Sequence, residues 1–410
     1  MSVILVACLS SFAELEVTGG TGVPSRIASL DGLRGCAVVM VMLYHFTAPF
    51  SDTADFATRG ALRLLSFGWT GVDVFFVLSG FLITGILTDA KGAKGYFRTF
   101  YMRRALRIVP LYYAALAAIF VVPQFLSSPV AQRLKIPFSD QAWFWLYLQN
   151  FHRLRGLSGQ FTGHLWSLAI EEQFYLVWPI AILLLSRRRA FQLCGGLAVL
   201  ALAMRIPWLF VMPGPGRSVF WATPTRLDGL VVGAAIALMP RGTRGLQPAR
   251  RIAIPVALVA LAVIGFVYAD SGYFAIANPI LRSFGLTAIA MLYGSLLVVA
   301  VLRPPRLISA VLESKPLAFF GQYSYGMYVI HVPLLIVLGS SGVTGARFES
   351  FIGNSLLALI AYTTTLLAAT VVSALLTWHL FEKRFLSLKR HFIVDSTSRK
   401  EQAVQIPVAQ

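Results

Sequence analysis

Residues 30–45 read Leu30-Asp31-Gly32-Leu33-Arg34-Gly35-Cys36-Ala37-Val38-Val39-Met40-Val41-Met42-Leu43-Tyr44-His45, and they predict a membrane helix with an ionisable group deep inside it. Arg34 and His45 are 11 residues apart, which on an α-helix is about three turns, or roughly 16 Å of rise. Both side chains therefore lie on nearly the same face. A charged residue at the centre of a bilayer costs about 2.5–3.5 kcal/mol on insertion scales, so such groups usually face a polar cavity. This stretch indicates a functional site inside a membrane domain.

The composition also favours a membrane-embedded chain. Of the 410 residues, 57% are hydrophobic and only 13% are charged, whereas a soluble domain carries about 25% charged residues. The net charge of +18 raises nucleic acid as a partner, but the basic residues lie between long apolar runs and are not gathered on one soluble module. We therefore expect a lipid bilayer around the chain and no nucleic-acid partner.

Ten apolar runs predict an all-α fold, a polytopic membrane helix bundle with about ten transmembrane helices. A helix needs roughly 17–25 residues to cross a bilayer, and the sixth run is short by that measure. The runs are 34–50, 70–88, 105–126, 164–185, 191–211, 226–239, 252–269, 283–302, 318–340 and 352–380.

The distribution of Lys and Arg predicts the orientation of this bundle. Of the 35 basic residues, 24 lie on one side, against 9 in the opposite loops, with Arg205 and Arg226 inside spans. The first set, counting Arg34, comprises the N-terminal segment, the connections 89–107, 186–190, 240–251 and 303–316, and the tail after 380. Because cytoplasmic loops carry an excess of Lys and Arg, we expect that side, and both termini, in the cytoplasm.

We expect one domain with two flanking segments. Residues 1–25 are predicted to be a disordered leader, or to lie upstream of the true start; 26–386 form the transmembrane domain, and 387–410 a cytoplasmic tail. The three cysteines, Cys8, Cys36 and Cys194, are too few and too scattered for a disulfide or metal framework. No metal site is expected.

Four further motifs place polar or aromatic residues in or beside the spans. In chain order they are Gly71-Val72-Asp73-Val74-Phe75-Phe76-Val77-Leu78-Ser79-Gly80-Phe81-Leu82, Tyr101-Met102-Arg103-Arg104-Ala105-Leu106-Arg107-Ile108-Val109-Pro110-Leu111-Tyr112, His164-Leu165-Trp166-Ser167-Leu168-Ala169-Ile170-Glu171-Glu172-Gln173-Phe174-Tyr175 and Tyr323-Ser324-Tyr325-Gly326-Met327-Tyr328-Val329-Ile330-His331. With the Arg-x10-His pair of the first helix, their order and spacing resemble the acyltransferase-3 family of integral membrane O-acyltransferases. The resemblance runs from about Ser29 to Glu382. It fits the stand-alone form, without an appended esterase-like domain.

The resemblance implies an enzyme of the plasma (bacterial inner) membrane that transfers an acyl group from cytoplasmic acyl-CoA, most often acetyl from acetyl-CoA. The expected acceptor is a hydroxyl group of a cell-surface or exported glycan, or of another small molecule. The motifs leave open which acceptor is used, whether the acyl group is acetyl, succinyl or longer, and which oligomer forms. No nucleophilic serine motif supports an acyl-enzyme intermediate.

His45 is the candidate general base, because an imidazole titrates near working pH and can take the proton of an acceptor hydroxyl. A carboxylate would fix its tautomer and stabilise its charged form. Asp73 and Glu172 are the candidates for that partner. The alternative is a histidine that only packs in the bundle.

Arg103, Arg104 and Arg107 are candidates for binding the phosphates of coenzyme A, on the side that we assign to the cytoplasm. Residues three and four apart on a helix share a face, so Arg107 can join Arg103 or Arg104 in a clamp, and guanidinium groups suit phosphate. Arg34 lies on the same side. The alternative is that the cluster only anchors the chain by its charge.

The remaining candidates could line a polar cavity. Glu171 and Glu172 are adjacent and point about 100° apart around a helix, so they cannot face one pocket equally; an ion pair that locks two helices is the alternative. Each of these residues also has a structural alternative. Trp166 and Tyr175 would then only pack in the bundle, and Asp228 would pair locally with Arg226 or cap a helix. His331 would lie at a helix kink caused by Pro333. The set of candidate cavity residues is Trp166, Ser167, Glu171, Tyr175, Asp228, Tyr325 and His331.

Two other classes of protein compete with the enzyme. Ionisable residues inside spans also mark transport pathways, so a transporter or flippase for a glycan precursor is the alternative function. Interrupted helices in matching halves, which are typical of transporters, are not evident. A polytopic scaffold would explain the spans but not the placement of Arg34 and His45.

Overall fold

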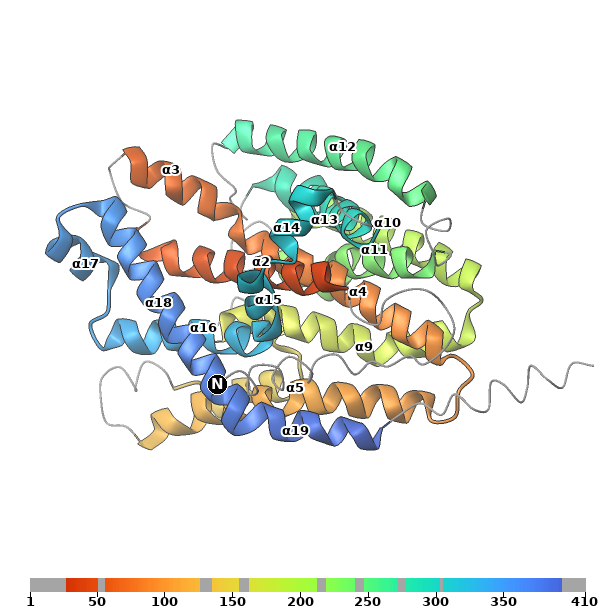
Figure 1. The fold of residues 1–410 in the computed structure, drawn as a ribbon, viewed down its shortest axis with the longest axis horizontal. Coiled ribbons are helices and arrows are strands. Elements are labelled where there is room, and N and C mark those ends of the chain that lie inside the picture. Colours follow the sequence, from red (N-terminus) through yellow and green to blue (C-terminus); the bar gives the residue numbers. More distant parts are fainter. Residues whose placement is uncertain are drawn as a thin grey trace, which may run out of the picture.

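The computed structural model describes residues 27–50, 56–125, 135–154, 162–211, 219–239, 247–271, 278–302 and 305–392. These residues form helices and connections, and no strand occurs in them. Helices α2, α4, α5, α9 and α12 run across the molecule in nearly the same direction (Figure 1). The helices are α2 (Ala28–Thr47), α3 (Phe56–Leu65), α4 (Gly71–Ala90), α5 (Tyr96–Val121), α7 (Phe138–Trp145), α8 (Gln149–Leu154), α9 (Trp166–Leu184), α10 (Arg187–Val211), α11 (Leu227–Leu238), α12 (Gln247–Ser271), α13 (Leu286–Val301), α14 (Arg306–Leu312), α15 (Lys315–Gln322), α16 (Ser324–Ser340), α17 (Gly345–Ile352), α18 (Ser355–Thr377) and α19 (Lys383–Ser387).

The predicted membrane helix bundle is confirmed. Within the described ranges, eight helices are long and apolar enough to cross a membrane, and the pair α15–α16 makes a ninth if it counts as one span. The sixth predicted run falls on α11, a shorter apolar helix. Each of the ten predicted runs thus coincides with a helix or a bent helix pair.

The ninth span is bent rather than straight, which the apolar run 318–340 did not predict. Helices α15 and α16 meet at Tyr323 with a bend of 72°. Gly321 lets α15 lie directly on the backbone of α2, since a Cβ at this position would be 1.9 Å from the carbonyl oxygen of Asp31. This close contact holds α15 against α2 while α16 packs against α18, α2 and α5.

Helix α4 forms the centre of the bundle and contacts α2, α9, α11 and α13. Its contact with α11 is very close: a Cβ at Gly80 would be 1.8 Å from the carbonyl oxygen of Leu230. Small residues allow this approach, and packing of this kind drives helix association in membranes, where lipid removes the hydrophobic driving force. The tight centre fixes the positions of the polar side chains that α4 carries.

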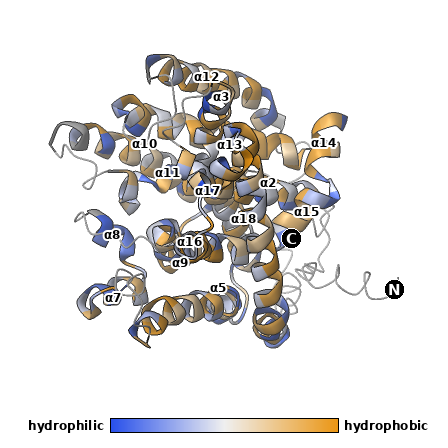
Figure 2. Cartoon of the chain, turned by 90° about the vertical axis from the view of Figure 1, so that its left-hand side faces the viewer, coloured by the Kyte–Doolittle hydropathy of each residue, from blue (hydrophilic) through white to orange (hydrophobic). Residues whose placement is uncertain are grey.

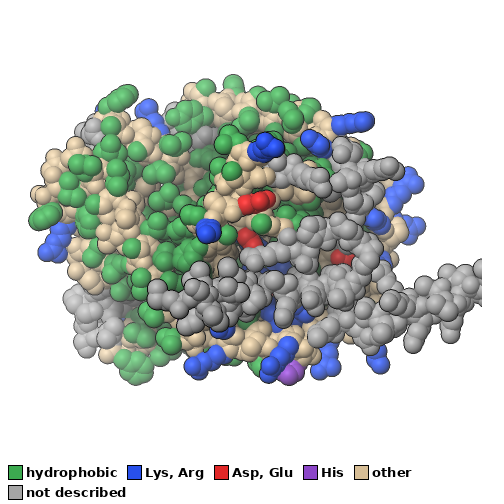
Figure 3. All heavy atoms as spheres, in the orientation of Figure 1, with side chains coloured by type: hydrophobic (Ala, Val, Ile, Leu, Met, Phe, Trp, Pro, Cys, Tyr) green, Lys and Arg blue, Asp and Glu red, His purple; other side chains and the backbone are tan. Residues whose placement is uncertain are grey.

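The outer surface is apolar where a bilayer would contact it. Helix α12 exposes side chains such as Leu258 and Val259, and apolar residues colour the outward faces of several helices (Figure 2). Hydrophobic side chains cover much of one face of the molecule, whereas Lys and Arg are more frequent toward its right-hand end (Figure 3). The α4–α5 and α9–α10 connections lie at that same end in Figure 1.

The cytoplasmic position of this end, and of both termini, stays a prediction. The predicted leader (1–25) and residues 393–410 of the predicted tail lie outside the described residues. Ser387 ends α19, and a short 3-10 helix, Leu388–His391, follows it.

Candidate active site

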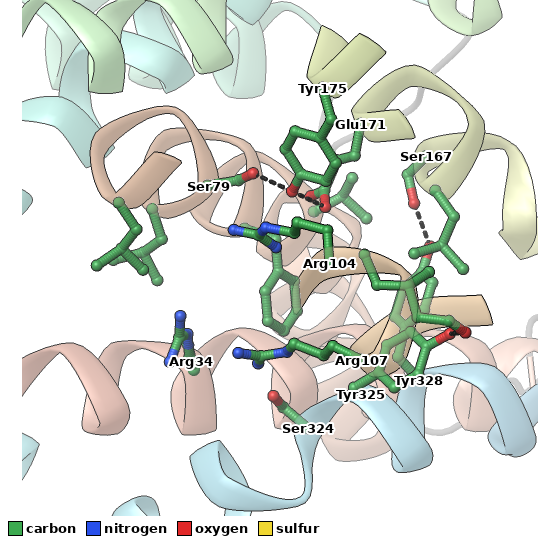
Figure 4. Close-up of a pocket in the computed structure, with 16 residues that line it drawn as sticks. Arg34, Ser79, Arg104, Arg107, Ser167, Glu171, Tyr175, Ser324, Tyr325 and Tyr328 are labelled. Carbon is green, nitrogen blue, oxygen red and sulfur yellow. Dashed lines mark hydrogen bonds between the residues drawn. The ribbon is translucent and has the colours of Figure 1, made fainter. Parts of the chain in front are cut away.

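A cavity lies among five helices and holds about 750 Å³ of space, part of which is open to solvent. It is lined from α2, α4, α5, α9 and α16, and Figure 4 shows its polar side chains converging from these helices. Its apolar wall comes mainly from α4. The lining residues are Arg34, Val72, Phe75, Leu78, Ser79, Leu82, Arg104, Arg107, Ile108, Ser167, Leu168, Glu171, Tyr175, Ser324, Tyr325 and Tyr328.

Three arginines converge on one part of this cavity. Arg34 comes from α2, whereas Arg104 and Arg107 come from one face of α5, and Figure 4 shows the three guanidinium groups close together. The guanidinium carbon of Arg104 lies 4.6 Å from the centre of the Tyr175 ring. Nη1 of Arg34 is 3.5 Å from Oδ1 of Asp31. Since guanidinium groups bind phosphate through paired hydrogen bonds, this part of the cavity suits a polyanion.

Arg103, which we grouped with these arginines, points elsewhere. Its side chain donates to the carbonyl of Phe392 at 3.1 Å, and it does not line the cavity. Neighbouring residues on a helix project about 100° apart, so Arg103 and Arg104 cannot both face the same site as Arg107, and in the structure Arg104 is the one that does. Three of the four predicted cofactor-binding arginines therefore reach the cavity.

A chain of hydrogen bonds links α4 and α9 on the cavity wall. The hydroxyl of Tyr175 donates to Oε2 of Glu171 at 2.7 Å, and Oγ of Ser79 contacts the same hydroxyl oxygen. Because the phenol has one hydrogen and an ionised carboxylate only accepts, Ser79 is the donor in the second bond. Glu171 and Tyr175 thus lie where we expected cavity residues (Figure 4).

Glu172 does not line the cavity, although we predicted it as a partner of His45. Its Oε1 is buried and has no hydrogen-bond partner among the described residues. The angle between neighbours on a helix explains the difference, because Glu171 occupies the cavity face of α9.

Ser167 and Tyr328 form the part of the cavity farthest from Arg34 in Figure 4. The hydroxyl of Tyr328 donates to the carbonyl of His164 at 2.7 Å, and Oγ of Ser167 lies 2.5 Å from that hydroxyl oxygen. Tyr325 donates to a backbone carbonyl of α5 at 2.7 Å and so ties α16 to α5.

Three histidines from three elements meet beside Tyr328. The centre of the His331 ring is 5.6 Å from that of Tyr328 and 5.0 Å from those of both His45 and His164. His45 lies on α2, His331 on α16, and His164 on the 3-10 helix η4 (Gly163–Leu165). The histidines do not themselves line the cavity. Tyr328 connects the two, because it lines the cavity and packs on His164 and His331.

The contacts of His45 determine which nitrogen carries its hydrogen. Nδ1 lies 2.8 Å from the carbonyl oxygen of Val41, which can only accept, so in the neutral ring Nδ1 carries the hydrogen and Nε2 keeps the lone pair. Nδ1 of His331 lies 2.7 Å from the carbonyl oxygen of Tyr328, so for the same reason it carries the hydrogen of the neutral His331 ring. Nε2 of His331 therefore keeps its lone pair, 3.3 Å from Nδ1 of His45. His45 therefore presents the lone pair of Nε2, in an orientation that His331 helps to fix.

Asp73 and Asp228 belong to a separate network of ion pairs. Asp73 Oδ1 is 2.9 Å from Nη2 of Arg226, and Asp228 Oδ2 is 2.8 Å from Nη1 of Arg205. Asp73 thus pairs with an arginine instead of His45, and Asp228 pairs with Arg205 instead of its sequence neighbour Arg226. All four side chains are at most 1% exposed. Because a buried charge without a partner costs several kcal/mol, each carboxylate stays with the guanidinium nearest in space.

Trp166 packs beside this network and does not line the cavity. Its ring lies 5.4 Å from the guanidinium carbon of Arg226 and 5.1 Å from the ring of Trp221. The packing interpretation of Trp166 therefore fits the structure. Among the candidate cavity residues, Ser167, Glu171, Tyr175 and Tyr325 line the cavity, whereas Trp166, Asp228 and His331 do not.

The sequence analysis did not single out Ser79, Tyr328 or His164. All three lie in the motifs quoted above, where a polar side chain inside an apolar span was the available signal. Their importance depends on contacts between helices distant in the sequence, which a motif does not contain.

Arg153 of α8 was also missed, because it lies in a predicted outer loop. Its guanidinium carbon lies 3.7 Å from the centre of the Trp221 ring, and it donates to the carbonyl of Gly163. Burial lowers the pKa of Arg153 to about 10, so the group stays charged at neutral pH. Its hydrogen bond anchors Gly163, the residue that precedes His164.

Comparison with known proteins gives the same family as the motifs. A family model described as an acyltransferase domain matches residues 27–378. The peptidoglycan O-acetyltransferase OatA of Listeria monocytogenes serovar 1/2a is 30% identical over 335 residues, which cover 75% of this chain and 49% of that protein. The O-acetyltransferase OatA of Staphylococcus aureus (strain NCTC 8325) is 28% identical over 340 residues, 78% of this chain and 53% of that protein.

A third relative, the putative peptidoglycan O-acetyltransferase YrhL of Bacillus subtilis (strain 168), is 30% identical over 335 residues, 76% of this chain and 49% of that protein. The chain thus spans about half the length of the curated relatives it matches. No solved structure matches it. Because the family model covers most of the chain, including every residue that lines the cavity, the chain belongs to the acyltransferase-3 family of acyl-transferring enzymes.

Proposed function

We propose that the chain is a membrane O-acetyltransferase that moves an acetyl group from acetyl-CoA to a hydroxyl group of a cell-wall glycan. The observation that carries this proposal is the arrangement of one cavity: three arginines on one part of its wall, and Tyr328, in contact with the histidines, on another. Few ligands need both features. Acyl-CoA does, because its phosphates and its reactive thioester are joined by a long flexible arm.

The donor would bind with its phosphates at Arg34, Arg104 and Arg107. From there the arm would follow the apolar wall of α4 toward Tyr328, so that the acyl group approaches the histidines. We place this arginine cluster on the cytoplasmic side, where coenzyme A is available.

His45 would then act as the general base. Its Nε2 takes the proton of the acceptor hydroxyl while the hydroxyl oxygen attacks the carbonyl carbon of the thioester. A C–O bond forms, the C–S bond breaks, and the proton passes from the imidazolium to the departing thiolate. The products are an acetyl ester and free coenzyme A, and His45 returns to its neutral form.

The acceptor would be a glycan outside the plasma membrane. Two of the relatives carry peptidoglycan in their names, so peptidoglycan fragments are the first acceptors to test. The orientation of His45 fits this proposal, because it lies about three turns along α2 from Arg34 and so on the side away from the phosphates.

Purified protein in proteoliposomes tests the proposal directly. Isotope-labelled acetyl-CoA is supplied on one side and peptidoglycan fragments on the other, and base-labile label on the glycan is measured by mass spectrometry. We expect labelled ester with the parent protein and none without donor. Movement of glycan across the membrane without consumption of thioester would overturn the proposal in favour of a flippase.

A further inference from the structure

His164 has a lone pair that no described residue uses. Its Nε2 lies 3.2 Å from the carbonyl oxygen of Val329, which can only accept, so in the neutral ring Nε2 carries the hydrogen and Nδ1 keeps the lone pair. The side chain is 3% exposed, and Nδ1 has no hydrogen-bond partner among the described residues. Buried polar atoms are nearly always paired, so each exception calls for an explanation.

The position of this lone pair suggests the explanation. The His164 ring lies 5.5 Å from Tyr328, which lines the cavity, and 5.0 Å from His331, which contacts His45. Both nitrogens of His331 are engaged, Nδ1 with a carbonyl and Nε2 with His45. Two lone pairs of this centre thus have no partner among the described residues: Nε2 of His45 and Nδ1 of His164.

A lone pair needs an N–H or O–H donor, and the substrates differ in this respect. The acetyl group and thioester of the donor carry neither; the nearest N–H of the donor is an amide two carbons beyond the sulfur, and an unchanged Kd of acetyl-CoA in a His164 variant distinguishes it from the acceptor. A sugar acceptor carries further hydroxyl groups beside the one that reacts.

We propose that Nδ1 of His164 binds the acceptor by accepting a hydrogen bond from a hydroxyl group next to the one that His45 deprotonates. This inference rests on the proposed function. It makes His164 a residue that selects acceptors with neighbouring hydroxyl groups, as in sugars, over isolated alcohols.

Two substitutions separate this role from a structural one. His164→Gln places a nitrogen donor near the position of Nε2, and so keeps the bond to Val329 while it removes the lone pair at Nδ1. His164→Asn does the reverse, because its amide oxygen can occupy the position of Nδ1. We expect His164→Gln to raise the acceptor KM about two- to tenfold, with kcat and the Kd of acetyl-CoA near those of the parent protein, and His164→Asn to keep the parent KM.

The opposite ranking, with His164→Asn impaired and His164→Gln like the parent, would assign His164 to the Val329 bond and overturn the proposal. A loss of kcat in both variants would make His164 a base and overturn it as well. Equal KM values in both variants and parent would exclude any role for Nδ1.

Deoxygenated acceptors test the same contact without depending on the folding of a variant. With the parent protein, removing one neighbouring hydroxyl of a peptidoglycan fragment should raise KM by the same two- to tenfold. The same removal should change nothing in His164→Gln, because the partner of that hydroxyl is already gone. If no single deoxygenation raises the parent KM, the inference fails while the proposed function stands; if the parent transfers no acetyl group, the proposed function itself fails.

Discussion

Replacing Arg104 with Ala should weaken binding of the donor, and the neighbouring arginine offers a matched control. Arg104 lines the cavity with Arg34 and Arg107, whereas Arg103 donates to the carbonyl of Phe392 away from it. Both substitutions remove one positive charge from the same turn of α5. Only the first removes a group that can reach a phosphate in the cavity.

The size of the effect follows from the kind of bond that is lost. A hydrogen bond to a charged group contributes about 1.5–3 kcal/mol, and each 1.4 kcal/mol is a tenfold change in affinity. Arg104→Ala should therefore raise the Kd of the donor by about 10- to 150-fold. The lower half of that range is expected, because the substitution also relieves repulsion among three converging guanidinium groups.

The assay is calorimetric titration of detergent-solubilised protein with a nonhydrolysable acyl-CoA. Arg103→Ala should stay within about twofold of the parent, because exposed or distant charges contribute little in moderate salt. Equal Kd values for Arg104→Ala and the parent would refute the assignment of the phosphate site. An equal loss of affinity in both variants would mean that the arginines attract anions only by their general positive charge.

Three further predictions test other parts of the molecule. His45→Gln should lower turnover at saturating substrates by about 10²–10⁴-fold with donor binding intact, and near-parent turnover would remove His45 as the base. Asp73→Ala should destabilise the fold by about 3–5 kcal/mol, because it leaves Arg226 buried without its partner. The double variant with Arg226→Met should recover part of the lost Tm in detergent. A parent-like Tm with lost turnover would instead link Asp73 to catalysis. Cysteines at the exposed positions Lys94 and Ser341 should be labelled from opposite sides of the membrane, and labelling from the same side would contradict the predicted topology.

The sequence was sufficient for the features that depend on helical periodicity. The separation of Arg34 and His45 put both on one side of α2, and in the structure Arg34 lines the cavity while His45 lies in the histidine group at its far part. The spacing also allowed Arg107 to share a face with Arg103 or Arg104, and in the structure Arg104 and Arg107 reach the cavity. Such relations within one helix follow from 3.6 residues per turn.

Partners on different helices could not be predicted in this way. Asp228 is two residues from Arg226 in sequence, yet it pairs with Arg205, and Arg226 pairs with Asp73 from another helix. The choice depends on how α4, α10 and α11 pack, and α4 and α11 approach closely enough for backbone contact at Gly80. A sequence shows which charged residues need a partner inside a membrane, but it does not show which helix supplies the residue of opposite charge.

The neighbour of His45 has a consequence for the proposed chemistry. A carboxylate beside a catalytic imidazole both fixes its tautomer and stabilises its charged form. His331 can do the first, since its Nε2 faces Nδ1 of His45 at 3.3 Å, but a neutral imidazole carries no negative charge for the second. Under the proposed mechanism the imidazolium must therefore be short-lived. Direct transfer to the leaving thiolate meets this need, because a thiol ordinarily has a pKa about two units above that of an imidazole, and the proton moves downhill as the C–S bond breaks.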